Sequence, residues 1–357
     1  MKINFGLYGS GWRSEFFLRV AQLMPEKFCV DGVITTNLEK KHRFESLFNV
    51  KCYTTLSEYL KHQTPMFIVE SVNKQFSAKT TMAILKKNIP VLMETPAGAD
   101  LETMLALYRE FPKDAKIQIA EQYPFHPLHQ ARYNLIQSKK LGDIQHVQVS
   151  FSHGYHGIAL IRRFLGIQFE NAVIQGTSFP LSVLSGVSRE GIPKKERLTT
   201  ENQTIAILDF GGKTALYNFE MSQHRSWVRT PIIQIKGDRG EIFNESVKYL
   251  LDFKTPIETE FIRKNLGENQ NVEGFGLKGI TAGENWYYHT PYPDSRLSDD
   301  EIAVAVCLEK MAHYVKTGES FYSFSEGAQD MYLALMIEKA IKEKGIVTTK
   351  TQEWVKN

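Results

Sequence analysis

The chain has 357 residues, 42% of them hydrophobic and 23% charged, with a net charge of only +3. This length is typical of two globular domains, and the weak charge bias argues against the basic surface that nucleic acids and anionic lipids require. Neither a run of about 18 apolar residues nor a signal-peptide pattern is present, so we expect no membrane span and no export. Three widely spaced cysteines, Cys29, Cys52 and Cys307, fit a cytoplasmic protein.

Apolar segments of strand length alternate with helical patterns through the first 121 residues. The predicted strands span 3–8, 29–34, 51–54, 66–70, 91–93 and 117–121, and the predicted helices lie near 14–24, 38–48, 55–62, 75–88 and 100–111. This alternation predicts a doubly wound parallel sheet of the Rossmann type, in which ligands bind beyond the carboxyl ends of the strands. Glu94 directly follows the strand VLM, so we expect it to face a ligand, or alternatively to cap the next helix.

After residue 121 the pattern changes to a helix over 125–142 and then to long alternating strands. These strands lie at 147–151, 204–221 and 232–243, and turns such as Gly211-Gly212 interrupt them. Hairpin turns between alternating strands predict a mostly antiparallel sheet with one buried face. Helical stretches near 298–317 and 324–344 follow. The sequence therefore predicts a Rossmann α/β domain over residues 1–121 and an α+β domain with a large open sheet over residues 122–357.

The stretch GLYGSGWRS after the first strand places Gly9 and Gly11 at the start of a helix. Glycines at this spacing let the backbone turn tightly and approach a pyrophosphate, and the helix N-terminus offers free N–H groups to its oxygens. Ser14 stands where the usual third glycine would be. Because the turn joins the first strand and helix of a βαβ repeat, we favour dinucleotide binding over a tight turn without function.

The second predicted strand ends in VITTN, with Thr35 and Thr36 where an acid usually binds the adenosine ribose. Lys40, Lys41 and Arg43 follow. Hydroxyls and cations suit a 2′-phosphate, so we predict NADP as the preferred cofactor, with NAD as the alternative. A second interpretation is that the basic residues form the exposed face of a helix.

Several segments, taken in order, resemble the glucose-fructose oxidoreductase / inositol dehydrogenase family (Gfo/Idh/MocA). They are the glycine turn, SVN at 71–73, ETPAGAD at 94–100, AEQYPFHP at 120–127, LIQSKKLGDIQHV at 135–147, HGYHGIALIRRFLG at 153–166 and the two last helices. The resemblance implies an NAD(P)-binding domain, a second domain for substrate and oligomer contacts, and redox chemistry on sugars, cyclitols or related carbonyls. It also implies cofactor contacts from Gly9, Ser10, Gly11, Trp12, Arg13, Thr35, Thr36, Ser71, Asn73, Glu94 and Gln122.

Two positions that concern proton transfer depart from the family pattern. Thr95 replaces the lysine of the family's Glu-Lys-Pro, and Ser152 stands where an aspartate often precedes the catalytic histidine. The resemblance places that histidine at His156. Hydride transfer at a carbon that bears oxygen requires proton transfer at that oxygen, and a histidine titrates near neutrality whereas a threonine does not. We therefore predict a catalytic group of His156, helped by Tyr155, with Thr95 as a hydrogen-bonding residue.

Two functions of different classes fit this sequence. The first is an NAD(P)-dependent oxidoreductase that acts on a small polar carbonyl or alcohol, and the second is a catalytically inactive dinucleotide-binding sensor. The histidine favours the enzyme, while the missing lysine and aspartate favour the sensor. Arg162 or Arg163 is a candidate to replace the charge of the lysine. We expect no metal, no nucleic acid and no membrane as partners, and a homo-oligomer, either dimer or tetramer, that covers the open sheet.

Overall fold

A computed structural model of the chain describes residues 2–189, 191–267, 274 and 276–355. The chain forms two compact units. The N-terminal unit comprises Met1–Pro127, Asn265–Lys278 and Thr290–Ala328, and the sheet unit comprises Leu128–Lys264, Gly279–His289 and Gln329–Asn357. Segments from the last third of the chain therefore belong to both units, and each unit is described by itself below.

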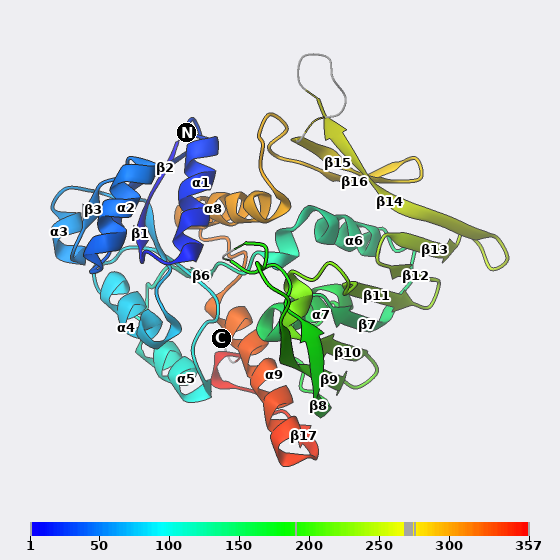
Figure 1. The fold of residues 1–357 in the computed structure, drawn as a ribbon. Helices are drawn as coiled ribbons and strands as arrows, with labels where there is room; N and C mark the ends of the chain where they lie inside the picture. Colours follow the sequence, from blue (N-terminus) through cyan, green and yellow to red (C-terminus); the bar gives the residue numbers. More distant parts are fainter. Residues whose placement is uncertain (1, 190, 268–273, 275, 356–357) are drawn as a thin grey trace. The chain divides into compact units, whose positions relative to one another are not determined.

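The N-terminal unit is built on a six-stranded parallel sheet, drawn in blue to cyan in Figure 1. Its order is β3-β2-β1-β4-β5-β6, and its strands are β1 (Ile3–Tyr8), β2 (Phe28–Ile34), β3 (Cys52–Tyr53), β4 (Phe67–Glu70), β5 (Val91–Met93) and β6 (Ile117–Ile119). The predicted doubly wound parallel sheet is confirmed. Because the chain moves in opposite directions from β1, right-handed crossovers place the helices on both faces, and the strand order reverses between β1 and β4.

Helices of the N-terminal unit follow the predicted alternation. They are α1 (Trp12–Leu23), α2 (Leu38–Phe48), α3 (Leu56–Leu60), α4 (Lys74–Leu85), α5 (Leu101–Glu110), the 3-10 turn η1 (Tyr123–Phe125) and α8 (Asp299–Thr317). The last of these comes from a distant part of the sequence and packs against α1, where Arg19 Nε lies 3.0 Å from Glu301 Oε1 (Figure 1). Helix α8 thus belongs to the N-terminal unit, although no local sequence pattern places it there.

Apolar side chains fill both faces of the parallel sheet. Phe5 and Phe67 on neighbouring strands stack with ring centroids 5.6 Å apart, and both side chains are fully buried. Strands covered on both faces are expected to be apolar throughout rather than alternating. This explains why FIV at 67–69 and VLM at 91–93 carry no polar residue, so polar groups occur only where these strands end.

The sheet unit contains an eleven-stranded sheet of order β16-β15-β14-β13-β12-β11-β7-β10-β9-β8-β17. The strands are β7 (Ile144–Ser150), β8 (Val173–Leu184), β9 (Leu198–Asp209), β10 (Thr214–Phe219), β11 (Ile232–Gly237), β12 (Gly240–Phe243), β13 (Ser246–Leu250), β14 (Pro256–Leu266), β15 (Gly276–Ala282), β16 (Asn285–His289) and β17 (Ile346–Thr348). Among the described strand pairs of this sheet, only β7 and β10 run parallel to each other. The predicted large, mostly antiparallel sheet is confirmed.

Three helices and two 3-10 turns complete the sheet unit. They are α6 (Pro127–Gln137), α7 (Gly154–Leu165), α9 (Phe324–Glu343), η2 (Met221–His224) and η3 (Glu353–Val355). The helix predicted over 125–142 is shorter than expected, because Phe125 belongs to η1 and the backbone turns left-handed at Lys139 and Gly142. Within the described ranges, every helix falls short of the length and apolar character that a bilayer crossing demands.

Candidate functional site

The turn between β1 and α1 has a backbone that only glycine can form at its first position. Gly9 has a φ of +126°, and a Cβ there would lie 2.1 Å from the carbonyl oxygen of Ser71. Gly11 is the N-cap of α1, and a Cβ on it would meet open space. Among the described residues no side chain caps α1, whereas α2 to α5 are capped by Asn37, Thr55, Asn73 and Asp100. The first-turn N–H groups of α1 can therefore donate hydrogen bonds to an anionic ligand, and the turn fits a dinucleotide pyrophosphate.

Hydroxyl groups connect this turn to the ends of the neighbouring strands. Ser10 Oγ lies 2.7 Å from Thr35 Oγ1, and Ser14 Oγ lies 3.4 Å from Ser71 Oγ. Ser14 is fully buried, which explains how a small hydroxyl residue can replace the third glycine. Of the other predicted cofactor contacts, Thr36 and Trp12 have exposed side chains and Asn73 caps α4. These predicted contacts thus lie around the ends of β1, β2 and β4.

Arg13 forms a polar network at the end of β5. Its Nε donates to Glu94 Oε1 at 2.8 Å, and its Nη2 donates to Gln122 Oε1. Gln122 in turn donates to Asp300 of α8 at 3.1 Å, and His126 Nε2 lies 3.1 Å from the same Asp300 oxygen. Burial alone would lower the pKa of Arg13, but the charge and hydrogen bond of Glu94 raise it above its usual value. Three predicted cofactor contacts, Arg13, Glu94 and Gln122, are therefore brought together.

Thr95 and the residues beside it occupy the position of the family's Glu-Lys-Pro. Glu94 directly follows β5, as predicted, and the alternative of a helix-capping role is wrong because Asp100 caps α5. The Thr95 N–H donates to Glu94 Oε2 at 3.2 Å, and the bond from Thr95 to Pro96 is cis. The backbone thus turns at Thr95 with Glu94 directed toward Arg13.

Two buried acids at the ends of β4 and β6, on either side of β5, escaped the sequence analysis. Glu70 is the last residue of β4 and Glu121 follows β6, and each is 1% exposed. Burial raises the pKa of Glu70 to about 7 and that of Glu121 to about 8. The rule that drew attention to Glu94, a polar residue at the carboxyl end of a parallel strand, applies equally to both.

The sheet unit contains a histidine cluster formed by His153, His156 and His224. His153 Nδ1 lies 3.0 Å from His224 Nε2, and the His153 ring is 4.9 Å from that of His156. Tyr155 packs against His156 with ring centroids 4.4 Å apart. Burial, together with the charges that the other two histidines would carry, lowers the pKa of His153 to about 3. His153 is therefore neutral near pH 7, and His224, which the sequence analysis did not single out, is its hydrogen-bond partner.

The segment before His156 is held by a buried tyrosine. Tyr217 Oη accepts a hydrogen bond from the Gly154 N–H at 2.7 Å. Ser152, at the position of the family's aspartate, is fully buried, and its hydroxyl has no hydrogen-bond partner among the described residues. The chain therefore has a small neutral residue where the family pattern would put a carboxylate.

Arg162 is not available to replace the missing lysine, and that expectation is wrong for it, whereas Arg163 is an exposed helix residue. Arg162 is buried in an ion pair with Asp330 at 2.5 Å and also donates to the carbonyl oxygen of Gln168. The guanidinium of Arg163 lies over the ring of Tyr133, 3.5 Å from its centroid. Arg162 thus serves the packing of the sheet unit.

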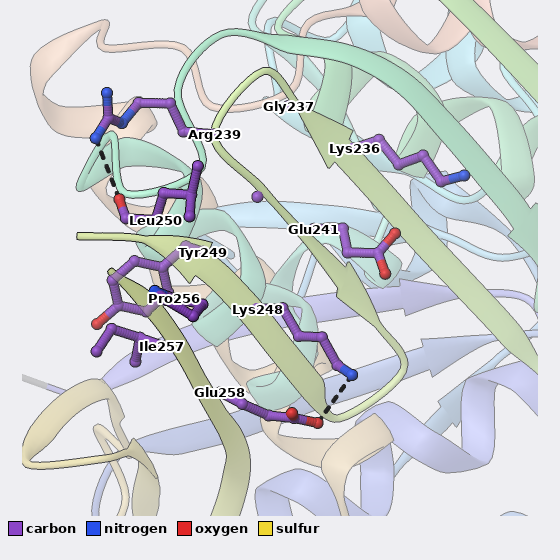
Figure 2. Close-up of a pocket in the computed structure, with 11 residues that line it drawn as sticks. Lys236, Gly237, Arg239, Glu241, Lys248, Tyr249, Leu250, Pro256, Ile257 and Glu258 are labelled. Atoms are coloured by element: carbon purple, nitrogen blue, oxygen red, sulfur yellow. Dashed lines mark hydrogen bonds and ion pairs between the residues drawn. The ribbon is translucent and has the colours of Figure 1, made fainter. Parts of the chain in front are cut away.

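A shallow groove of about 510 Å³ lies elsewhere on the sheet unit, over β11 to β14 (Figure 2). Three of its charged side chains are engaged with one another or with the backbone. Lys248 Nζ lies 2.9 Å from Glu258 Oε1, and Arg239 donates to the carbonyl oxygen of Leu250 at 3.2 Å. The groove contains none of the predicted site residues, so we do not regard it as the candidate active site.

The glycine turn and the strand-end residues lie within a segment that matches a known family. Residues 3–122 match the model of the oxidoreductase family with an NAD-binding Rossmann fold, GFO_IDH_MocA. The resemblance drawn from the sequence motifs is thereby confirmed over this segment, which matches the family's NAD-binding Rossmann domain.

Solved structures resemble this chain over nearly its whole length, whereas a comparison with curated proteins gave no match. A myo-inositol dehydrogenase from Corynebacterium glutamicum has a TM-score of 0.67 and 13% identity, and the match covers 99% of this chain and 100% of the other. The WlbA dehydrogenase from Bordetella pertussis, in complex with NADH and UDP-GlcNAcA, has a TM-score of 0.64 and 14% identity, with 98% of each chain covered. Levoglucosan dehydrogenase in complex with NADH has a TM-score of 0.70 and 13% identity, with 99% and 100% covered. At these identities the similarity concerns the fold.

Proposed function

We propose that this protein transfers a hydride between a nicotinamide cofactor and the oxygen-bearing carbon of a small polar substrate, with an unusual set of groups for the proton. The observation that carries the proposal is the uncapped first turn of α1, which begins at the Gly9–Gly11 turn beside the point where the strand order reverses. The bound nicotinamide would supply or accept the hydride. The protein's own residues must bind and orient the substrate and move the proton.

NADP is the proposed cofactor in preference to NAD. The segment that follows β2 offers the hydroxyl groups of Thr35 and Thr36 and the amide of Asn37 in place of a carboxylate. An acid there would repel a 2′-phosphate, whereas hydroxyl groups and the lysines at 40 and 41 of α2 would accept one. Arg43 is less suited to this role, because it is paired with Glu15 at 2.5 Å.

His156 is the proposed proton carrier, and Tyr155 and Thr95 are the proposed helpers. The proposal for His156 rests on the family resemblance and on its chemistry, since an imidazole exchanges protons near neutral pH. The neutral His153, hydrogen-bonded to His224, is well suited to keep the neighbouring rings in place without adding charge. Thr95 has no useful pKa and would contribute a hydrogen bond.

The proposed substrates are sugars, cyclitols or related polar carbonyl compounds. Support comes from the inositol, levoglucosan and nucleotide-sugar ligands or activities named for proteins of the same fold.

We also propose a homo-oligomer, a dimer or tetramer, because strands β8 and β9 expose apolar side chains, namely Phe179, Leu184, Leu198 and Ile207. The free cysteines Cys29, Cys52 and Cys307 are consistent with the proposed cytoplasmic location.

A cofactor-binding sensor without catalysis is the second candidate. The fully buried Ser152 and the threonine at position 95 favour it, because both family groups that would assist proton transfer are missing. A sensor would still bind the dinucleotide, so binding alone does not separate the two candidates.

Turnover measurements separate them. We expect the wild-type protein to oxidise NADPH in the presence of at least one member of a panel of sugars, cyclitols and α-carbonyl compounds. His156→Ala should reduce kcat about 10²- to 10⁴-fold and leave NADP⁺ affinity unchanged. Thr95→Ala should retain most of the activity. Tight cofactor binding without turnover of any compound would favour the sensor, and activity that survives His156→Ala would exclude this histidine as the proton carrier.

A further inference from the structure

The connection between β10 and β11 in the sheet unit carries an unusual set of exposed side chains. It comprises residues 220–231, with the sequence EMSQHRSWVRTP, and we call it the His224 loop. Trp227 is 70% exposed, Val228 is 87% exposed, and Arg225 is exposed as well. Two large apolar side chains and a cation thus stand together at the surface, directly after a histidine of the histidine cluster.

Hydrogen bonds hold the base of the His224 loop in place. The buried Glu220 accepts the Ser222 N–H at 2.6 Å, and its own N–H donates to Gln223 at 3.0 Å, so the two form a capping box. Gln223 also donates to Ser150 of β7 at 3.1 Å. Where the loop returns, Arg229 Nε lies 3.8 Å from Glu220. The exposed residues of the loop are therefore presented from a base with defined geometry.

His224 attaches the loop to the histidine cluster. Its Nε2 lies 3.0 Å from His153 Nδ1, and its ring packs against Phe219 with centroids 4.9 Å apart. The His153 ring in turn contacts that of His156, the proposed proton carrier. Arg225 is the next residue after His224 in the chain. The side chain of Arg225 therefore starts at the edge of the cluster to which a substrate must come.

A second connection brings a further cation to the His224 loop. The β8–β9 connection, described over residues 185–189 and 191–197, packs against it, because a Cβ on Gly186 would lie 3.4 Å from the Arg225 carbonyl oxygen and 4.0 Å from Ser226 Cα. Arg189 belongs to this connection, and partial burial followed by the like charge of Arg225 lowers its pKa. Two guanidinium groups from different connections are therefore held near each other.

The two connections together carry an excess of positive charge. Their sequences contain six lysine or arginine residues and three glutamates, whereas the whole chain is nearly balanced, with 43 basic and 40 acidic residues. One of the three glutamates, Glu220, is buried in the capping contacts. Like charges that are brought together repel each other, and a bound anion offsets that repulsion. This part of the surface therefore suits a negatively charged ligand.

Trp227 adds an apolar face two positions after Arg225. The Val228 N–H donates to Ser226 Oγ at 3.2 Å, and this bond closes the turn that presents the indole. An aromatic ring offers a large, rigid apolar surface against which the C–H face of a sugar or cyclitol can pack. The His224 loop thus offers a cation for a charged group and a ring for a carbon frame.

We propose that the His224 loop binds the substrate and that this substrate carries an anionic group, a carboxylate or a phosphate, on a sugar or cyclitol frame. Arg225 binds the anionic group through charge-assisted hydrogen bonds, since a guanidinium matches the oxygens of either anion, and Arg189 adds a second positive charge. Trp227 packs against the carbon frame. A neutral sugar lacks the group that Arg225 binds and is therefore the poorer ligand. This inference rests on the proposed function, because it names the substrate class of the same site.

Calorimetry on the full chain, with and without NADP⁺, tests the proposal with matched pairs of probes. The pairs are glucose with glucuronate, glucose with glucose 6-phosphate, and myo-inositol with its 1-phosphate. We expect the Kd of at least one anionic probe to be at least about tenfold lower than that of its neutral counterpart. The carboxylate and phosphate pairs show which anion the loop binds. Equal affinities within every pair would overturn the inference.

Variants then identify the groups responsible. Arg225→Gln should abolish most of the preference for the anionic probe, and Arg225→Lys should keep part of it, because the charge remains. Trp227→Ala should instead weaken both members of a pair by a similar factor, about threefold to tenfold. Arg239→Gln, at an exposed position in the turn between β11 and β12, should behave like the wild type. The comparison of wild-type affinities needs no variant, so it decides the matter even if a substitution prevents folding.

The outcomes distinguish this inference from the function on which it rests. If neutral sugars are turned over and bind as tightly as their anionic counterparts, the proposed function stands and the inference fails. An anionic preference that persists unchanged in Arg225→Gln would also overturn it. If Trp227→Ala changes the oligomeric state and leaves both affinities unchanged, the tryptophan belongs to a subunit contact and does not bind the carbon frame. If the anionic probes bind more tightly but neither nucleotide supports turnover of any compound, the proposed function fails and the anion site stands.

Discussion

Arg13 in the N-terminal unit and His153 in the sheet unit are both polar side chains with little exposure to water, and they differ in charge. Burial lowers the pKa of Arg13, but Glu94, 2.8 Å away, raises it above its usual value. Burial lowers the pKa of His153 as well, and its two neighbouring histidines lower it further, so it is neutral. An opposite charge thus preserves ionisation on burial, and like groups suppress it. Substitutions around Arg13 should therefore change the free energy of unfolding strongly, and substitutions around His153 should change it little.

Arg13→Met should destabilise the folded protein more than any other single substitution in either cluster. Removing the guanidinium leaves Glu94 buried without its partner, and uncompensated buried charges are strongly destabilising. We expect the free energy of unfolding, measured by urea denaturation, to fall by about 3 kcal/mol. The control is Arg43→Met, which removes the half-exposed partner of Glu15 and should cost less than about 1 kcal/mol. Equal losses in the two variants would contradict the distinction between buried and exposed pairs.

The pH dependence of stability should be the next largest effect. The pKa of Glu121 is raised in the folded protein, so its contribution to stability is present below about pH 4.5 and is lost as the pH rises through about 8. Urea denaturation should show a decrease of roughly 2 kcal/mol in the free energy of unfolding between pH 6 and pH 9. Glu121→Gln should remove most of this decrease, and Glu102→Gln should not change it. A wild-type pH dependence in Glu121→Gln would show that other groups are responsible.

Ser152→Ala should have the smallest effect. The serine hydroxyl is buried without a partner among the described residues, so its loss leaves nothing unsatisfied. We expect the free energy of unfolding to change by less than about 0.5 kcal/mol, or to increase slightly. Tyr217→Phe is the matched comparison, because it removes the acceptor of the Gly154 N–H and should cost about 1 kcal/mol. A loss in Ser152→Ala as large as that in Tyr217→Phe would mean that the hydroxyl has a partner.

The strands of the two sheets differ in how well the sequence predicted them. Short apolar strands such as FIVE in β4 were recognised because both faces are covered and few polar residues interrupt them. Strand β8 was missed although it pairs with β9 along all twelve of its residues. Its sequence VIQGTSFPLSVL contains Gly176 and Pro180 and exposes most side chains, so neither alternation nor an apolar run marks it as a strand. Its pairing with β9, the next strand along the chain, holds it in the sheet.

For the candidate site, too, the sequence predicted some residues and missed others. Gly9, Gly11 and Glu94 could be recognised locally, because a tight turn demands glycine and a polar residue is conspicuous at the end of an apolar strand. Glu70 and Glu121 obey the same rule but stand in segments that were assigned entirely to strands. The network around Gln122 could not be predicted, since its partner Asp300 lies 178 residues further along the chain.

The sequence by itself determined the parallel sheet, the glycine turn and the loss of the family lysine, because periodicity, backbone conformation and residue type are local properties of the chain. Only the tertiary structure decided which groups carry charge. The pKa values of Glu121 and His153 depend on burial and on neighbours contributed by other elements. Since the energy of a charge depends on everything within several ångströms of it, no single segment of the sequence contains that information.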